Sequence, residues 1–214
     1  MEREQVGIFF ESKPMKEAGL TQETLLSAIT KTHNILDQID AKLLEVGADR
    51  ISQMIELANL SSMVGNLFAA EIAKNSSGSF KRNGPHKYPD LLANSENSKD
   101  IEIKVALETN KPKGHLAKSG YYMTCRYVLV DNEGKYNDQK RGHIVAIWEV
   151  RFGHLEEKHF NLSNTPGDSG KTAVVNLQGM QALQIAYLNI AIAPYSEKSA
   201  TYKILKRLIN SVEK

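Results

Sequence analysis

Residues 88–107 read YPDLLANSENSKDIEIKVAL, two apolar segments separated by a polar turn. If IEIKVAL forms a strand, its side chains alternate between two faces. One face then carries Ile101, Ile103 and Val105, while Glu102 and Lys104 project together from the other face. The pattern predicts a β-hairpin whose second strand is anchored in a core by its isoleucines and presents an acid beside a lysine.

Asp90 is expected to join this pair. The segment YPDLLA can pair with IEIKVAL as an antiparallel neighbour across NSENSKD, which would bring Asp90 beside Glu102. Two carboxylates with an adjacent lysine predict a hard-oxygen site suited to Mg²⁺. Such a site supports phosphodiester hydrolysis, because Mg²⁺ stabilises charge on phosphoryl oxygens and acidifies water, which Lys104 can orient. The alternative is a surface hairpin with an ordinary exposed Glu–Lys pair.

A third acid lies in the helix predicted to precede the hairpin. Leu60, Val64, Leu67 and Glu71 follow the spacing of one apolar stripe. An acid on such a stripe is costly to bury unless it is paired or faces a metal. We therefore expect Glu71 near the catalytic centre, and the alternative is that it lies at the end of the stripe and reaches solvent.

A helical Glu, then PD, then E-x-K on a second strand resembles the PD-(D/E)XK nuclease superfamily, especially type II restriction endonucleases, over residues 64–130. The resemblance implies that Asp90 and Glu102 are Mg²⁺ ligands together with the Ile103 carbonyl. It also implies that Lys104 is the catalytic lysine and Glu71 an auxiliary acid. Mg²⁺-dependent, sequence-specific cleavage of double-stranded DNA to 5′-phosphates, by a homodimer, is the implied activity.

Other assignments stay open at this point. Asp100 or Glu108 could replace one ligand if the register differs by one or two residues. The same superfamily includes structure-specific repair and junction-resolving nucleases. A non-enzymatic DNA-binding or helical interaction protein is a further alternative, in which the N-terminal helices form the functional surface and the hairpin is inert.

Cationic segments flank the predicted centre, and phosphate contacts would supply affinity for DNA. They are KRNGPHK before the hairpin, NKPKGHLAK after it and QKRGH farther on. The alternative for each residue is a solvated loop side chain. The candidate DNA-binding residues are Lys81, Arg82, Lys87, Lys111, Lys113, His115, Lys118, Lys140 and Arg141, with His86 and His143 in the same segments.

The predicted elements run from helices to short strands and back to helices, which favours an α/β fold with a restriction-endonuclease-like mixed β-sheet flanked by helices. At 214 residues we expect a single nuclease domain. Its expected parts are a mainly helical N-terminal region at 1–78, a catalytic sheet region at 79–165 and C-terminal helices at 166–214. Strands are predicted at 90–93, 101–107, 121–131 and 143–152, and helices at 21–46, 49–78, 174–193 (with a strand-like tail) and 196–214.

Composition excludes several other classes. The chain is 41% hydrophobic with a net charge of +2, and no apolar run approaches the roughly 18 residues of a membrane helix. A single cysteine and an acidic N-terminus lead us to expect a cytoplasmic protein without disulfides and without a membrane partner. GDSGKT ends like a phosphate-binding loop, but Thr165 stands where that pattern needs glycine, so no nucleotide cofactor is expected.

Overall fold

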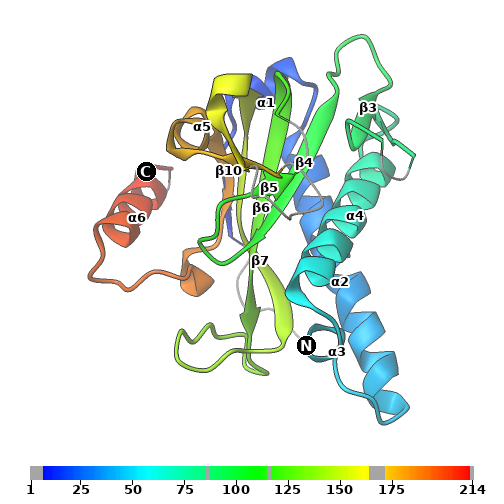
Figure 1. The fold of residues 1–214 in the computed structure, drawn as a ribbon, viewed down its shortest axis with the longest axis vertical. Coiled ribbons are helices and arrows are strands. Elements are labelled where there is room, and N and C mark those ends of the chain that lie inside the picture. Colours follow the sequence, from blue (N-terminus) through cyan, green and yellow to red (C-terminus); the bar gives the residue numbers. More distant parts are fainter. Residues whose placement is uncertain (1–6, 85–86, 115–116, 164–171, 213–214) are drawn as a thin grey trace.

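The computed structural model describes residues 7–84, 87–114, 117–163 and 172–212. Its centre is a seven-stranded mixed sheet with the order β1-β10-β7-β6-β4-β3-β2, and a three-stranded sheet has the order β5-β9-β8 (Figure 1). The strands are β1 Ile8–Phe9, β2 Phe80–Arg82, β3 Leu91–Ala93, β4 Ile101–Leu107, β5 Lys113–Gly114, β6 Gly120–Val130, β7 Ile144–Leu155, β8 Phe160–Ser163, β9 Thr172–Val175 and β10 Gln184–Leu188. The helices are α1 Lys13–Glu17, α2 Gln22–Glu45, α3 Ile51–Met54, α4 Leu57–Asn75, α5 Leu177–Ala182 and α6 Ala200–Val212, with 3₁₀ turns η1 Glu157–His159 and η2 Ile190–Ile192.

The predicted α/β class is confirmed at the level of a large mixed sheet flanked by helices. Strands β2, β3 and β4 form an antiparallel meander, β4 pairs in parallel with β6, and β6 pairs antiparallel with the long strand β7. The four strands predicted around residues 90–152 correspond to β3, β4, β6 and β7.

One face of the main sheet is covered by α2 and α4 (Figure 1). Helix α2 begins after the N-cap Thr21, whose hydroxyl accepts a hydrogen bond from Thr24 N at 3.1 Å. It ends before Gly47, whose φ of +79° is a conformation that glycine adopts without strain. These caps are local, and the predicted helix over 21–46 is confirmed.

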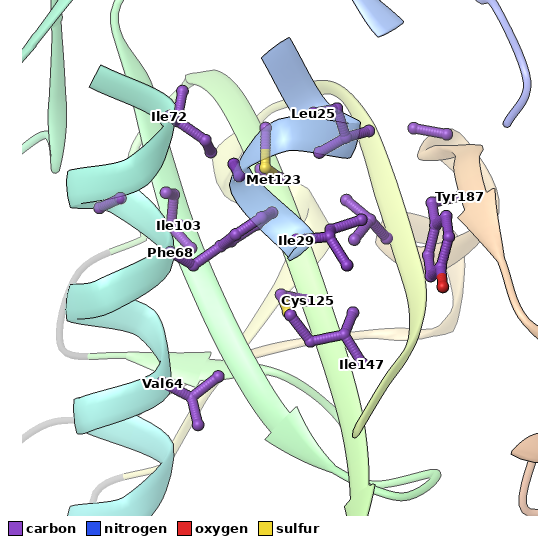
Figure 2. Close-up of a cluster of buried hydrophobic side chains, with 14 of the residues drawn as sticks. Leu25, Ile29, Val64, Phe68, Ile72, Ile103, Met123, Cys125, Ile147 and Tyr187 are labelled. Carbon is purple, nitrogen blue, oxygen red and sulfur yellow. The ribbon is translucent and has the colours of Figure 1, made fainter. Parts of the chain in front are cut away.

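Phe68, on α4, lies at the centre of the core between this helix layer and the sheet. It has no exposed surface, and it lies near Ile103 on β4 in Figure 2. Leu25 and Ile29 from α2 and Met123 from β6 belong to the same cluster (Figure 2). The apolar face of IEIKVAL is therefore buried against the helices, as the alternation predicted.

The other face carries two separate apolar clusters. One gathers Trp148, Val128 and Leu188 of the sheet with Leu205 and Ile209 of α6. The second lies around Tyr122 and Leu155 and includes residues of α5 and of the three-stranded sheet.

Two expectations about secondary structure were wrong in part. The segment 174–193, predicted as a helix with a strand-like tail, does contain a helix followed by a strand, but the helix is only the short α5. The end of β9 precedes α5, η2 follows β10, and β10 is inserted into the main sheet between β1 and β7. The helix predicted over 49–78 is divided into α3 and α4 by an extended Ile55. The N-terminal region is mainly helical, and it also contributes the two-residue strand β1. In the first segment pairing with distant strands, and in the second a local break, overrode the helical periodicity.

Cys125, in the middle of β6, should not react with thiol reagents in the native protein. Its side chain is fully buried, and burial raises the pKa of the thiol far above its usual range, so little thiolate forms. We expect no reaction with a chromogenic disulfide reagent under native conditions and one thiol per chain after denaturation. Rapid modification of the folded protein would contradict the buried position of β6.

Candidate active site

The hairpin of β3 and β4 brings Asp90 to Glu102. Leu91 lies opposite Ile101 in the antiparallel register, so Asp90, directly before β3, is opposite Glu102. Asp90 Oδ2 accepts a hydrogen bond from Ile103 N at 2.7 Å. Because the N–H and C=O of one residue point to the same side of a strand, the Ile103 carbonyl also faces the side on which Asp90 lies.

Glu102 and Lys104 are a buried ion pair. Each residue is 8% exposed, and Lys104 Nζ donates to Glu102 Oε1. Burial raises the pKa of the Glu102 carboxyl, Lys104 acts to lower it, and the neighbouring Asp90 raises it further. The alternative of an exposed surface pair is wrong, because both charges lie away from solvent.

This donor set fits a small hard cation. Across the described ranges, no three His, Cys, Asp or Glu side chains form a group that could hold a metal. Mg²⁺, however, is commonly held by one or two carboxylates together with water. The negative charges of Asp90 and Glu102 repel each other, and Glu102 is buried from water. The Ile103 carbonyl faces the side of β4 on which Asp90 lies. A divalent cation bound between these oxygens would relieve the repulsion. The chemistry of these oxygen donors therefore suits Mg²⁺.

Glu71 has partners of its own on α4. It is 4% exposed, its Oε1 accepts from Lys74 Nζ at 2.7 Å, and Asn75 Nδ2 donates to its backbone carbonyl at 2.6 Å. Helix α4 packs on the face of β4 that carries Ile103, which is opposite to the face of Glu102. The contacts described for Glu71 are thus local to its helix, and its predicted auxiliary role stays a prediction.

The two neighbouring acids have other contacts. Asp100 Oδ1 accepts from Ala93 N at 2.8 Å and closes the hairpin. Glu108 follows the far end of β4, where its N–H donates to Tyr127 O at 2.7 Å and its carbonyl accepts from Trp148 Nε1 at 3.2 Å. Because Leu91 lies opposite Ile101, the register favours Asp90 and Glu102 as the two candidate carboxylate ligands over Asp100 and Glu108.

The connection between the parallel strands β4 and β6 passes beside Lys104. It contributes β5, and a Cβ added to Gly114 would lie 2.3 Å from Lys104 Nζ and 2.7 Å from its Cε. The absence of a side chain at Gly114 therefore leaves room for the lysine to reach Glu102. The sequence showed a Pro/Gly-containing loop here, but not that it would lie against the lysine.

Gly114→Ala should displace the Lys104 ammonium from Glu102. We expect a loss of about 1–3 kcal/mol in the free energy of unfolding from overpacking, and a fall of up to about 10²-fold in any activity that requires this lysine. Denaturant titration and DNA cleavage would measure the two effects. Gly84→Ala is the matched control, because its Cβ would meet only Lys87 Cδ at an ordinary 3.5 Å. Equal behaviour of the two variants would contradict the contact.

A buried polar row continues from Lys104 across the sheet, and sequence reasoning did not identify it. Thr124 lies beside Lys104 in the register of β4 and β6, and Arg151 lies beside Thr124 on β7. Glu149 bridges Arg126 at 3.1 Å and Arg151 at 2.9 Å. The signal in the sequence was alternation in GYYMTCRYVLV and IVAIWEVRFGHL, which places these side chains on the face of Glu102 and Lys104.

The predicted basic residues divide into two groups. The first group is exposed and belongs to β2, to the segment before β3 and to the connection between β4 and β6. Its members are Lys81, Arg82, Lys87, Lys111, Lys113 and Lys118. Lys140, Arg141 and His143 belong to the β6–β7 connection, which follows the opposite end of β6 (Figure 1). At about 3.3 Å per residue, Tyr122 and Val130 are roughly 26 Å apart along that strand. His86, His115 and the segment 164–171 lie outside the described residues.

No protein-family model matches the chain, and no curated protein is significantly similar to it. Among the described residues, no helix combines the length and the apolar character needed to cross a membrane.

Proposed function

We propose that this chain is a Mg²⁺-dependent endodeoxyribonuclease of the PD-(D/E)XK kind, and specifically a type II restriction endonuclease of the cytoplasm. The observation that carries the proposal is the hairpin contact. Asp90 accepts a hydrogen bond from Ile103 N, between Glu102 and Lys104, so two carboxylates, a carbonyl and an ammonium group converge at one point of a mixed sheet. The proposed fold is accordingly restriction-endonuclease-like.

Asp90, Glu102 and the Ile103 carbonyl would hold Mg²⁺, which when bound supplies positive charge for phosphoryl oxygens and acidifies water. Lys104 orients the attacking water and shares the charge that develops on the phosphate. The water oxygen bonds to phosphorus, the bond from phosphorus to the 3′ oxygen breaks, and that oxygen takes a proton. The products are a 5′-phosphate and a 3′-hydroxyl.

Double-stranded DNA is the proposed substrate because exposed lysines and Arg82 flank the hairpin on both sides in the sequence. Cutting both strands of a symmetric site requires two centres related by a two-fold axis, so we propose a homodimer.

Plasmid DNA incubated with the protein in Mg²⁺, and separately in EDTA, tests the activity. We expect the wild type to give discrete fragments only with Mg²⁺. Lys104→Ala should lower the cleavage rate by about 10²–10³-fold. The control is Lys42→Ala, which removes an exposed lysine on α2 that pairs with Glu45 and should leave the rate unchanged. Thermal melts of each variant verify folding. Cleavage of branched substrates alone would favour a structure-specific nuclease, and no cleavage of any DNA by the wild type would overturn the enzymatic proposal.

A further inference from the structure

Tyr88, two residues before Asp90, lies beside the proposed centre. Its ring is partly buried, and its hydroxyl lies near Gly120 at the start of β6, the strand that pairs with β4. Tyr88 is not among the site residues predicted from the sequence.

The Tyr88 hydroxyl lies against the start of β6. A Cβ added to Gly120 would lie 3.2 Å from it, so the absence of a side chain at Gly120 leaves space for the phenol. Tyr122, two residues farther along β6, lies beside Glu102 in the β4–β6 register, has no exposed surface and donates its hydroxyl hydrogen to Lys118 O at 2.8 Å. The Lys118 backbone and the Tyr88 ring therefore both lie at this end of β6.

The Lys118 ammonium lies over this ring. Its Nζ is 4.5 Å from the Tyr88 ring centroid, a distance at which the aromatic face attracts a cation. Lys118 is exposed, whereas Lys104 is buried and paired with Glu102. An incoming phosphate can thus meet the Lys118 charge without breaking an ion pair.

We propose that Lys118 binds a DNA backbone phosphate next to the scissile one, and that Tyr88 is the positioning residue that holds its ammonium at the edge of the centre. This inference rests on the proposed function for its substrate class. Among the predicted basic residues, Lys118 is the proposed phosphate ligand. Tyr88 would act only by holding Lys118 and would not contact the phosphate.

Duplex binding in EDTA, followed by fluorescence anisotropy over a range of salt concentrations, tests the proposal independently of cleavage. For each phosphate contact the binding constant falls as about the 0.9 power of the salt concentration. Lys118→Met should therefore make the slope of log binding constant against log salt concentration shallower by about 1. At 0.1 M salt its affinity should be roughly eightfold lower than that of the wild type. Tyr88→Leu should reduce affinity about twofold to fivefold, and Tyr88→Phe, which keeps the ring, should bind like the wild type.

The double variant Tyr88→Leu/Lys118→Met should bind no more weakly than Lys118→Met, because the tyrosine acts through the lysine. Lys42→Met, on the far face of the sheet, is the charge-matched control, and thermal melts verify the folding of all variants. An unchanged salt slope in Lys118→Met, or additive losses in the double variant, would overturn the inference while leaving the nuclease proposal intact. Absence of duplex binding by the wild type would overturn both.

Discussion

Asp90→Asn should lower Mg²⁺-dependent DNA cleavage by about 10²–10³-fold or more while leaving the protein folded. The amide retains an oxygen that can accept the hydrogen bond from Ile103 N, so the hairpin contact survives. What is lost is one of two negative charges that would hold the cation. Single-turnover cleavage of a duplex at saturating Mg²⁺ measures the effect.

The stability of Asp90→Asn separates loss of function from loss of fold. Removing a charge beside Glu102 lowers the pKa of that carboxyl, whose folded-state pKa is raised by burial and by Asp90. An acid whose pKa is higher in the folded than in the unfolded state lowers the free energy of unfolding as the pH rises above its unfolded-state pKa, which for Glu is near 4.5. The variant should therefore equal or exceed the wild type by up to about 1 kcal/mol at pH 7, and gain less at pH 4. Wild-type cleavage by a folded Asp90→Asn protein would exclude Asp90 from the centre.

Phe68→Ala should destabilise the protein by about 3–5 kcal/mol, the usual cost of deleting a fully buried aromatic ring. The ring packs with Ile103 in the cluster beneath β4, so the cavity would form directly behind the strand that carries Glu102 and Lys104 (Figure 2). For a chain of this size the melting temperature should fall by roughly 6–20 °C. Urea denaturation with an unchanged m-value would identify the change as one of native-state stability.

Met54→Ala provides the comparison for Phe68→Ala. Met54 is 53% exposed on the short helix α3, and its truncation should change stability by no more than about 0.5 kcal/mol. If Phe68→Ala were as mild, the packing of α4 on the sheet would be wrong.

Local patterns in the sequence predicted the part of the fold that surrounds the hairpin. The alternation in IEIKVAL and the polar turn before it were sufficient to predict β3, β4 and the approach of Asp90 to Glu102. Helix α2 was equally predictable, because its stripe, its Thr21 cap and Gly47 are all local signals.

The segment 174–193 shows where such reasoning ends. Its apolar spacing suits a helix, yet β10 becomes a strand because it pairs with β1 and β7, which are far away in the sequence. Pairing between distant strands has no counterpart in local periodicity.

The sequence by itself determined which side chains share a face of β4, because alternation in a strand is a property of neighbouring residues. Only the tertiary structure decided that Glu102 and Lys104 are buried, that Gly114 lies against Lys104, and that Lys118 lies over Tyr88. Burial and cross-strand contact depend on which distant segments pack together, and that choice is made by the whole core.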